Sequence, residues 1–125
     1  MIKFNKDETL FVEKYRPQTV ADCILPAKIK KPFQDIVDQQ KLPNMLLCGT
    51  AGLGKTSIAL ALCEELGYTS YFINASLDNG IDILRTKIRQ FASGNSLHAS
   101  FKVIILDEAD SLTSATQDAL RGFIE

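Results

Sequence analysis

Residues 49–56 read GTAGLGKT, and they stand between a short apolar run and a stretch of helical periodicity. The run, MLLC at 45–48, is wholly apolar, as a strand buried on both faces of a parallel sheet is. The helical pattern extends over about 55–66 and stops at Gly67. A glycine-rich loop that joins a strand to a helix and ends in Gly-Lys-Thr fits the phosphate-binding pattern GxxxxGK[ST]. The stretch therefore predicts an α/β fold with phosphate bound at a helix N-terminus.

The residue types in this loop suit the binding of a nucleotide. The three glycines let the backbone wrap around the phosphates so that its N–H groups point at the anion. Lys55 is expected to reach the β- and γ-phosphates, and the Thr56 hydroxyl is expected to bind Mg²⁺. The alternative is a chance glycine-rich turn, which the flanking strand and helix disfavour. The predicted contact residues are Gly49, Gly52, Leu53, Gly54, Lys55, Thr56 and Ser57.

A second motif, VIILDEAD at 103–110, is an apolar strand that ends in carboxylates. Strand ends at one edge of a parallel sheet meet at the same ligand crevice, so this motif is the expected partner of the loop. Asp107 is expected to hold Mg²⁺, while Glu108 is expected to polarise the attacking water and, with Lys55, to form the catalytic set. The alternative is a solvated acidic turn before a helix N-terminus. The role of Asp110 stays open between structure and capping.

Short apolar runs alternate with helical spacing along the rest of the chain, which predicts a parallel sheet flanked by helices. Pro32 lies near the start of one helical pattern, where a missing N–H costs least. Ser114 and Gln117 have the spacing of a capping box for the last helix. The other predicted elements are helices over about 29–37 and 81–92, and strands at 71–73 and 103–106.

Composition places the chain among soluble globular proteins, since 46% of its residues are hydrophobic and 23% are charged. The net charge of −1 argues neither for nor against nucleic acid, because a binding face needs only a local basic cluster. The three cysteines form no CxxC pair and are interpreted as reduced core thiols, and His98 has no metal-binding pattern around it. Charges interrupt the apolar residues of the N-terminus, which predicts a cytoplasmic protein without a membrane span.

The N-terminal sequence VEKYRP at 12–17 resembles the box that opens sliding-clamp loader subunits of the replication factor C and tailed-phage families. The resemblance continues over nearly the whole chain and implies an AAA+ ATPase that binds ATP and Mg²⁺. The segment DCILP at 22–26 and the short spacing look most like those of the large subunit of a T-even-type phage clamp loader. The further segments that carry the resemblance are DCILP at 22–26, NAS at 74–76, GID at 80–82, LDEA at 106–109 and ALR at 119–121.

The resemblance also implies roles for residues outside the two motifs. Residues 1–43 would form an adenine-side segment, with Tyr15, Arg16, Pro17 and Ile24 around the base, and residues 44–125 would form the Walker A to Walker B core. The helices after the second and third strands would face DNA and position its phosphates without reading sequence. The DNA-facing candidates are Arg85, Lys87, Arg89, Gln117 and Arg121, for which a solvated helix face is the alternative.

The function implied by the resemblance is that of an ATP-hydrolysing subunit that opens a sliding clamp and loads it onto primer-template DNA. Its partners would be the other subunits of the loader, the clamp and the DNA, in the host cytoplasm if the protein is phage-encoded. Alternatives are an ATP-binding module that cannot hydrolyse, another AAA+ motor such as a helicase loader, or a DEAD-box helicase suggested by the literal letters DEAD at 107–110.

The chain departs from the family pattern after Glu125, where no fourth strand, arginine finger or helical lid follows. In the family's sheet the fourth strand lies between the first and the third. We therefore expect the strand predicted at 45–48 to lack a neighbour, and we interpret the chain as part of a longer protein or half of a split one.

Overall fold

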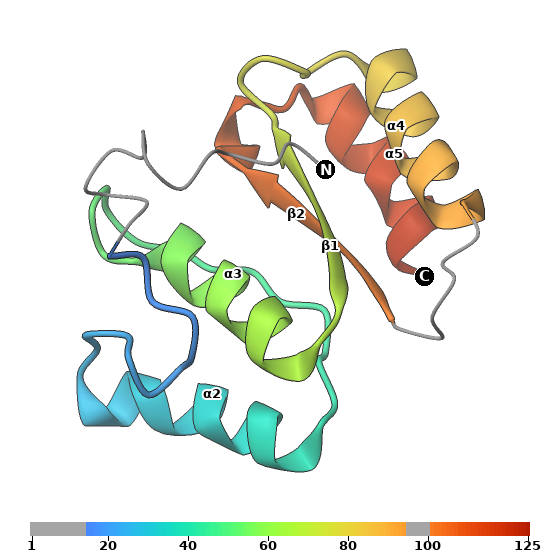
Figure 1. Cartoon of the computed structure of the whole chain (residues 1–125). Coiled ribbons are helices and arrows are strands. Elements are labelled where there is room, and N and C mark those ends of the chain that lie inside the picture. The colour runs from blue at the N-terminus through green and yellow to red at the C-terminus, as the bar shows by residue number, and fades with distance from the viewer. Residues whose placement is uncertain (1–14, 95–100) are drawn as a thin grey trace.

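The computed structural model describes residues 15–94 and 101–125 of the chain. Its centre is a pair of parallel strands, β1 (Thr69–Asn74) and β2 (Lys102–Asp107). Helices lie on both sides of this pair (Figure 1), so the α/β class predicted from the sequence is confirmed. His98 and the first part of the VEKYRP stretch lie outside the described residues.

Two helices stand on each side of the strands. One pair packs on the side of the phosphate-binding loop, and the other pair follows the two strands along the chain (Figure 1). No described helix is long and apolar enough to cross a membrane. The helices are α2 (Ala27–Gln39), α3 (Lys55–Leu66), α4 (Ile81–Ser93) and α5 (Ser114–Ile124), with a short 3-10 helix, η1 (Ala109–Ser111), after β2.

The parallel register between the strands sets the geometry of the site. Thr69 lies opposite Lys102 at one end of the ladder, and Asn74 lies opposite Asp107 at the other. The carboxyl ends of β1 and β2 therefore lie together at one edge of the sheet, as predicted for parallel strands at 71–73 and 103–106. Those strands are confirmed and are longer than predicted.

Each side of the strand pair has its own hydrophobic core. Between α4, α5 and the strands, the buried residues Ile73, Leu84 and Ile88 form one cluster, with Ile104 and Leu106 packed against it. On the other side, α2 and α3 share a second cluster. Burial of such side chains stabilises by about 1.5–3 kcal/mol each. The second cluster consists of Val20, Cys23, Ile58, Ala61 and Leu62.

The helix over residues 55–66 has the predicted bounds, and Gly67 ends it as predicted. Gly67 adopts φ 68°, and the following Tyr68 N–H donates to the Cys63 carbonyl at 2.9 Å. Glycine reaches this left-handed conformation without the steric cost that a Cβ adds.

Two details of the predicted helices are wrong. Pro32 lies inside α2 rather than in its first turn, which starts at Ala27. The cap of α5 is Thr113, whose hydroxyl accepts the Thr116 N–H at 3.3 Å, so the Ser114–Gln117 capping box is not formed. Thr113 takes the extended conformation that an N-cap needs, whereas Ser114 is already helical.

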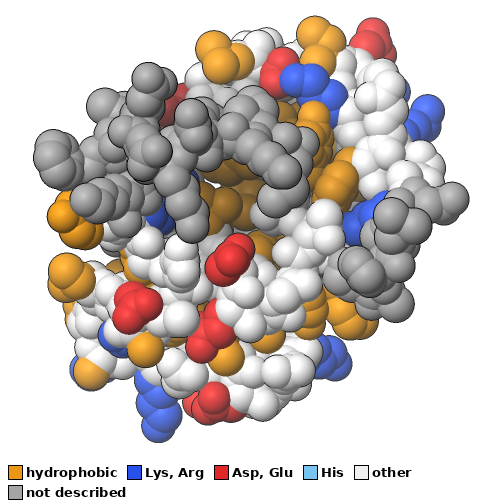
Figure 2. Space-filling model, viewed as in Figure 1, with side chains coloured by type: hydrophobic (Ala, Val, Ile, Leu, Met, Phe, Trp, Pro, Cys, Tyr) orange, Lys and Arg blue, Asp and Glu red, His pale blue; other side chains and the backbone are white. Residues whose placement is uncertain are grey.

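The strand predicted at 45–48 is also wrong: the segment is irregular, and its backbone forms no hydrogen bond with another described residue. A strand needs a neighbouring ladder, and β2 pairs with β1 alone in the described chain. Leu46 is 82% exposed, while Leu47 packs on the α2–α3 side. Figure 2 shows hydrophobic side chains exposed at several places on the face that it draws.

The cysteines correct a further prediction. Cys23 and Cys63 are buried free thiols, and burial raises the pKa of each above its ordinary value. Cys48 is a free but exposed thiol, because it belongs to the unpaired segment at 45–48. The interpretation of core thiols therefore holds for two of the cysteines and fails for Cys48.

Candidate nucleotide-binding site

The phosphate-binding loop takes backbone conformations that depend on glycine. Gly52 and Gly54 adopt φ 78° and 86°, and Gly54 is the residue that precedes α3. At Gly49, a Cβ would stand 2.9 Å from the Leu53 Cδ1 atom, closer than carbon atoms normally approach. Side chains at these positions would change the path of the loop, so the glycine pattern has the conformational reason that the sequence suggested.

Lys55 is the first residue of α3, and its side chain turns back over the loop. Its Nζ donates to the carbonyls of Gly49 and Thr50, each at 2.8 Å. An ammonium group held at the helix N-terminus adds a full positive charge to the partial charge of the free N–H groups there. This end of α3 therefore attracts anions.

Thr56 and Asp107 bring the two motifs together. The Thr56 hydroxyl in the first turn of α3 lies 3.2 Å from Asp107 Oδ1 at the end of β2, across 51 residues of sequence. Both side chains are half-buried. The register of β2 and the packing of α3 on the strands fix this approach. The predicted meeting of the loop with the strand-end carboxylate is present in the geometry.

Glu108 follows Asp107 in an unusual backbone conformation. Its φ of 52° is left-handed, its side chain is exposed, and its carbonyl accepts the Ser111 N–H at 3.0 Å. Non-glycine residues adopt this conformation at a cost, and such residues cluster at functional sites. Asp110 lies in η1 and is exposed.

The oxygen pair of Thr56 and Asp107 fits a magnesium ion. Mg²⁺ prefers hard oxygen ligands and binds through one or two protein groups together with water and phosphate oxygens. Among residues 15–94 and 101–125, no three His, Cys, Asp or Glu side chains group to hold a metal.

The residues predicted to surround the adenine differ in their exposure. Ile24 is fully exposed and Tyr15 is 71% exposed, while Arg16 and Pro17 are half-buried. Ser57, the last predicted loop contact, is half-buried in α3. These positions neither add to the Thr56–Asp107 geometry nor conflict with it.

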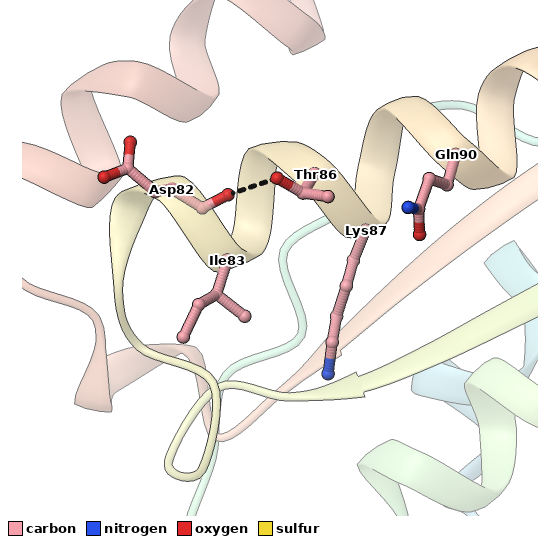
Figure 3. A pocket seen from close by; sticks show the side chains of 5 residues that line it. All are labelled: Asp82, Ile83, Thr86, Lys87 and Gln90. Carbon is pink, nitrogen blue, oxygen red and sulfur yellow. Dashed lines mark hydrogen bonds between the residues drawn. The ribbon is translucent and has the colours of Figure 1, made fainter.

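Of the DNA-facing candidates on α4, two are exposed and the third is paired with an acidic residue. Arg85 and Arg89 are exposed on α4. Lys87 instead forms an ion pair with Asp78 at 2.6 Å, which raises the pKa of the lysine through the hydrogen bond. It lines a shallow concavity of α4 (Figure 3) with Asp82, Ile83, Thr86 and Gln90.

The two candidates on α5 are exposed. Gln117 donates from Nε2 to the Leu112 carbonyl at 3.1 Å, and Arg121 lies 3.5 Å from Asp118. On the face drawn in Figure 2, Lys and Arg side chains are scattered and do not gather into one patch.

Sequence reasoning assigned no role to Asn74 and none to Thr116. Asn74 stands opposite Asp107 in the ladder, and its Oδ1 accepts from the Ser76 N–H at 2.9 Å and the Ser76 hydroxyl at 2.6 Å. A strand that ends in Asn-Ala-Ser is a local signal for such a turn. Thr116 is buried in α5, and no local pattern pointed to its distant partner.

Comparison with known proteins agrees with this geometry. The chain is 42% identical to replication factor C subunit 3 of Saccharomyces cerevisiae, over 98% of the chain and 38% of the relative. It is 45% identical to mouse replication factor C subunit 5, over 92% of the chain and 36% of the relative. It is 40% identical to the replication factor C small subunit of Sulfolobus acidocaldarius, over 96% of the chain and 39% of the relative.

The chain thus spans less than two fifths of the length of these relatives. A family model matches residues 45–124, from the apolar run before the phosphate-binding loop to the end of α5. Because this match covers more than half of the sequence, the chain belongs to the ATPase family associated with various cellular activities (AAA).

Proposed function

We propose that this chain is the ATP-binding and hydrolysing part of a sliding-clamp loader subunit. The observation that carries the proposal is the 3.2 Å approach of Thr56 and Asp107, which unites the loop with the strand-end carboxylate. Such a pair is the expected Mg²⁺ position of a nucleotide-hydrolysing site. The division into an adenine-side segment at 1–43 and a core at 44–125 is part of the same proposal.

The residues of the site have separate roles in this proposal. Lys55 would leave the carbonyls of Gly49 and Thr50 to neutralise the phosphates, which offer the ammonium a charged partner. Thr56 and Asp107 would orient Mg²⁺, which supplies charge neutralisation when bound. Glu108 is exposed one residue beyond Asp107 and would accept a hydrogen bond from the attacking water and orient it.

The proposed cofactors are ATP and Mg²⁺. The helix N-terminus of α3 and Lys55 favour a polyphosphate, but they do not select the base. Selection of adenine is assigned to Tyr15, Arg16, Pro17 and Ile24 on the resemblance of the VEKYRP stretch alone. Leu53 is 56% exposed and is available to contact the nucleotide.

Clamp loading and the partners follow from the likeness to replication factor C subunits. We infer that the chain works beside other loader subunits, acting on a sliding clamp and primer-template DNA, in the cytoplasm. The relatives named above come from yeast, mouse and an archaeon, so they lend no support to the proposed phage origin. The AAA match favours this reading over the DEAD-box alternative.

The DNA contacts are proposed for the exposed side chains first. Arg85 and Arg89 on α4, and Gln117 and Arg121 on α5, are accessible to a phosphate backbone. Lys87 would have to leave Asp78 before it could bind DNA, which makes it the weakest of the candidates.

The proposal is tested by ATP binding and turnover in the full-length chain that carries this sequence, assembled with its partner subunits and primer-template DNA. Lys55→Ala is expected to lose ATP binding. Glu108→Gln is expected to keep binding and to lose turnover by about a hundredfold or more, as removal of a general base does. Glu64→Gln, a change of an exposed glutamate on α3, is the matched control and should leave both unchanged.

The outcomes separate the alternatives. Turnover retained in Glu108→Gln would refute the assigned role of that carboxylate. Binding without turnover in the unmodified assembly would favour the binding module, and duplex unwinding without clamp loading would favour a different AAA motor.

A further inference from the structure

Two segments leave the carboxyl end of the strand pair side by side. One runs from β1 through residues 75–80 to α4, and the other runs from β2 through residues 108–113 to α5 (Figure 1). They start at the register pair Asn74 and Asp107, where the Ala75 N–H donates to the Asp107 carbonyl at 2.9 Å. The second segment contains Glu108, so its path decides where that carboxylate stands.

The first segment is fixed at its start and in its middle. The N–H groups of Leu77 and Asp78 donate to the Asn74 carbonyl at 3.1 and 3.0 Å. The Asp78 carboxylate then pairs with Lys87 on α4. These contacts make residues 74–78 a compact turn whose far end is tied to α4.

Thr116 joins this first segment to α5. Its hydroxyl donates to the Asn79 carbonyl at 3.1 Å and lies 2.8 Å from the Thr113 hydroxyl, the cap of α5. Thr116 is 1% exposed and is the one buried polar residue among those that the structure describes. A buried hydroxyl without its partner costs about 1–3 kcal/mol, so this contact is strongly maintained.

The contact constrains the second segment as well. Thr113 lies five positions after Glu108, and the residues between them form η1 and the buried Leu112. The Glu108 side chain is exposed and has no hydrogen bond to another described residue, so its placement depends on the backbone that carries it. The contact between Thr116 and Asn79 fixes the start of α5, and it therefore restrains the backbone of residues 108–113 as well.

We propose that the Thr116 hydroxyl is a positioning group for Glu108, acting through its bond to the Asn79 carbonyl between the two segments. Thr116 does not touch the nucleotide site itself, since its bonds go to Asn79 and Thr113. This inference rests on the proposed function, because it assigns the placement of the proposed catalytic carboxylate.

Thr116→Val is the decisive variant, because it keeps the shape of the side chain and removes the hydroxyl. We expect kcat for ATP hydrolysis to fall roughly threefold to tenfold, while KM and ATP affinity stay unchanged. Lys55 and Thr56 belong to α3, which packs against the other cluster and is not reached by the change. Thr116→Ser keeps the hydroxyl and is expected to restore turnover.

Thr86→Val is the matched control. The Thr86 hydroxyl donates at 2.8 Å to the Asp82 carbonyl of its own helix α4 (Figure 3) and joins no second segment. The same replacement there should leave kcat unchanged. All variants are measured in the full-length chain with its partner subunits, and their folding is compared by circular dichroism and thermal melting.

Each result decides the proposal. Unchanged kcat in Thr116→Val would overturn it, as would an equal loss of ATP affinity, which would mark a general structural role. If Thr116→Val does not fold, Thr116→Ala is measured in its place under the same criteria. Absence of turnover in the unmodified protein would instead overturn the proposed function, so the two failures are distinguishable.

Discussion

The Thr56 hydroxyl and Asp107 Oδ1 lie 3.2 Å apart although their elements pack against different hydrophobic clusters. Thr56 is carried by α3, and Asp107 ends the strand that packs beneath α4 and α5. The contact therefore requires both cores to be formed.

Thr56→Val should weaken ATP binding in the presence of Mg²⁺ by about tenfold, because a methyl group cannot bind the metal or Asp107. Thr56→Ser keeps the hydroxyl and should bind like the unmodified protein. Titration of a fluorescent ATP analogue with Mg²⁺ and with EDTA measures both. An equal loss in the two conditions would mean that Thr56 acts on the loop and not on the metal.

Lys102→Met should lower the free energy of unfolding by about 1 kcal/mol. Lys102 Nζ donates to the carbonyls of Phe91, Ala92 and Gly94, and it lies 5.6 Å from the Phe91 ring centre. It thus binds the carbonyls at the end of α4, which have no partners within the helix. Urea unfolding measures the change.

Lys31→Met is the control for this prediction, since Lys31 is exposed on α2 and forms no hydrogen bond or ion pair with another described residue. The two variants lose the same charge and gain the same side chain. Equal stability of both would show that the three carbonyl contacts of Lys102 contribute nothing in solution.

Gly67→Ala and Gly122→Ala should change stability in opposite directions. Gly67 has φ 68°, where a Cβ costs about 1–2 kcal/mol, although the space around it is open. Gly122 lies inside α5 with no atom near its Cβ position, so alanine should stabilise by about 0.5–1 kcal/mol. Thermal melting compares them, and destabilisation by Gly122→Ala would contradict the assigned helix.

Thiol reagents should modify Cys48 rapidly and leave Cys23 and Cys63 protected. Burial raises the pKa of Cys63, and it raises that of Cys23 although Lys30 acts in the opposite direction. A thiol with a raised pKa in the folded chain stabilises it fully below its ordinary pKa of 9.0. That contribution is lost as pH rises through the folded-state pKa, so the free energy of unfolding should fall in alkaline solution.

Mass spectrometry after brief labelling identifies the modified cysteine, and Cys48→Ala should abolish the fast reaction. Cys63→Ala should flatten the decline of stability above pH 9.0. Fast labelling of Cys63 in the native chain would contradict its burial.

Arg85→Ala and Arg89→Ala should each weaken DNA binding for all sequences alike and make it less sensitive to salt, as loss of a phosphate contact does. Lys87→Ala should have a smaller effect on DNA binding, because Lys87 is paired with Asp78. Fluorescence anisotropy with primer-template DNA over a range of salt concentrations measures both quantities. A larger effect of Lys87→Ala would show that the ion pair opens when DNA binds.

Local patterns predicted much of this fold, because short-range periodicity reports burial directly. The apolar run before Asp107 became β2, and the stretch that starts at Lys55 became α3 with Gly67 at its end. The strand at 45–48 was wrong because a ladder depends on a distant partner. Adjacent Thr113 and Ser114 are both good caps, so composition could not decide between them.

Contacts between distant segments explain what the sequence could not predict in the site. Thr56 and Asp107 could be predicted because each stands at a fixed position of a motif whose chemical role is known. Thr116 has no such pattern, and its partner Asn79 is 37 positions away. Likewise, the pairing of Lys87 with Asp78 shows that a basic residue on a helix face can be occupied by its own chain.

The parallel register of β1 and β2 determines where Asp107 lies relative to Thr56. A slip of one position would turn Asp107 to the opposite face of the strand pair, and a slip of two would move it by about 6–7 Å along β2. Either error would separate it from Thr56 while leaving the helices formed, although a slip of one would also turn Ile104 and Leu106 away from the cluster that they pack against. Nucleotide affinity thus reports whether the strands have paired correctly, which spectroscopic measures of helix content would not reveal.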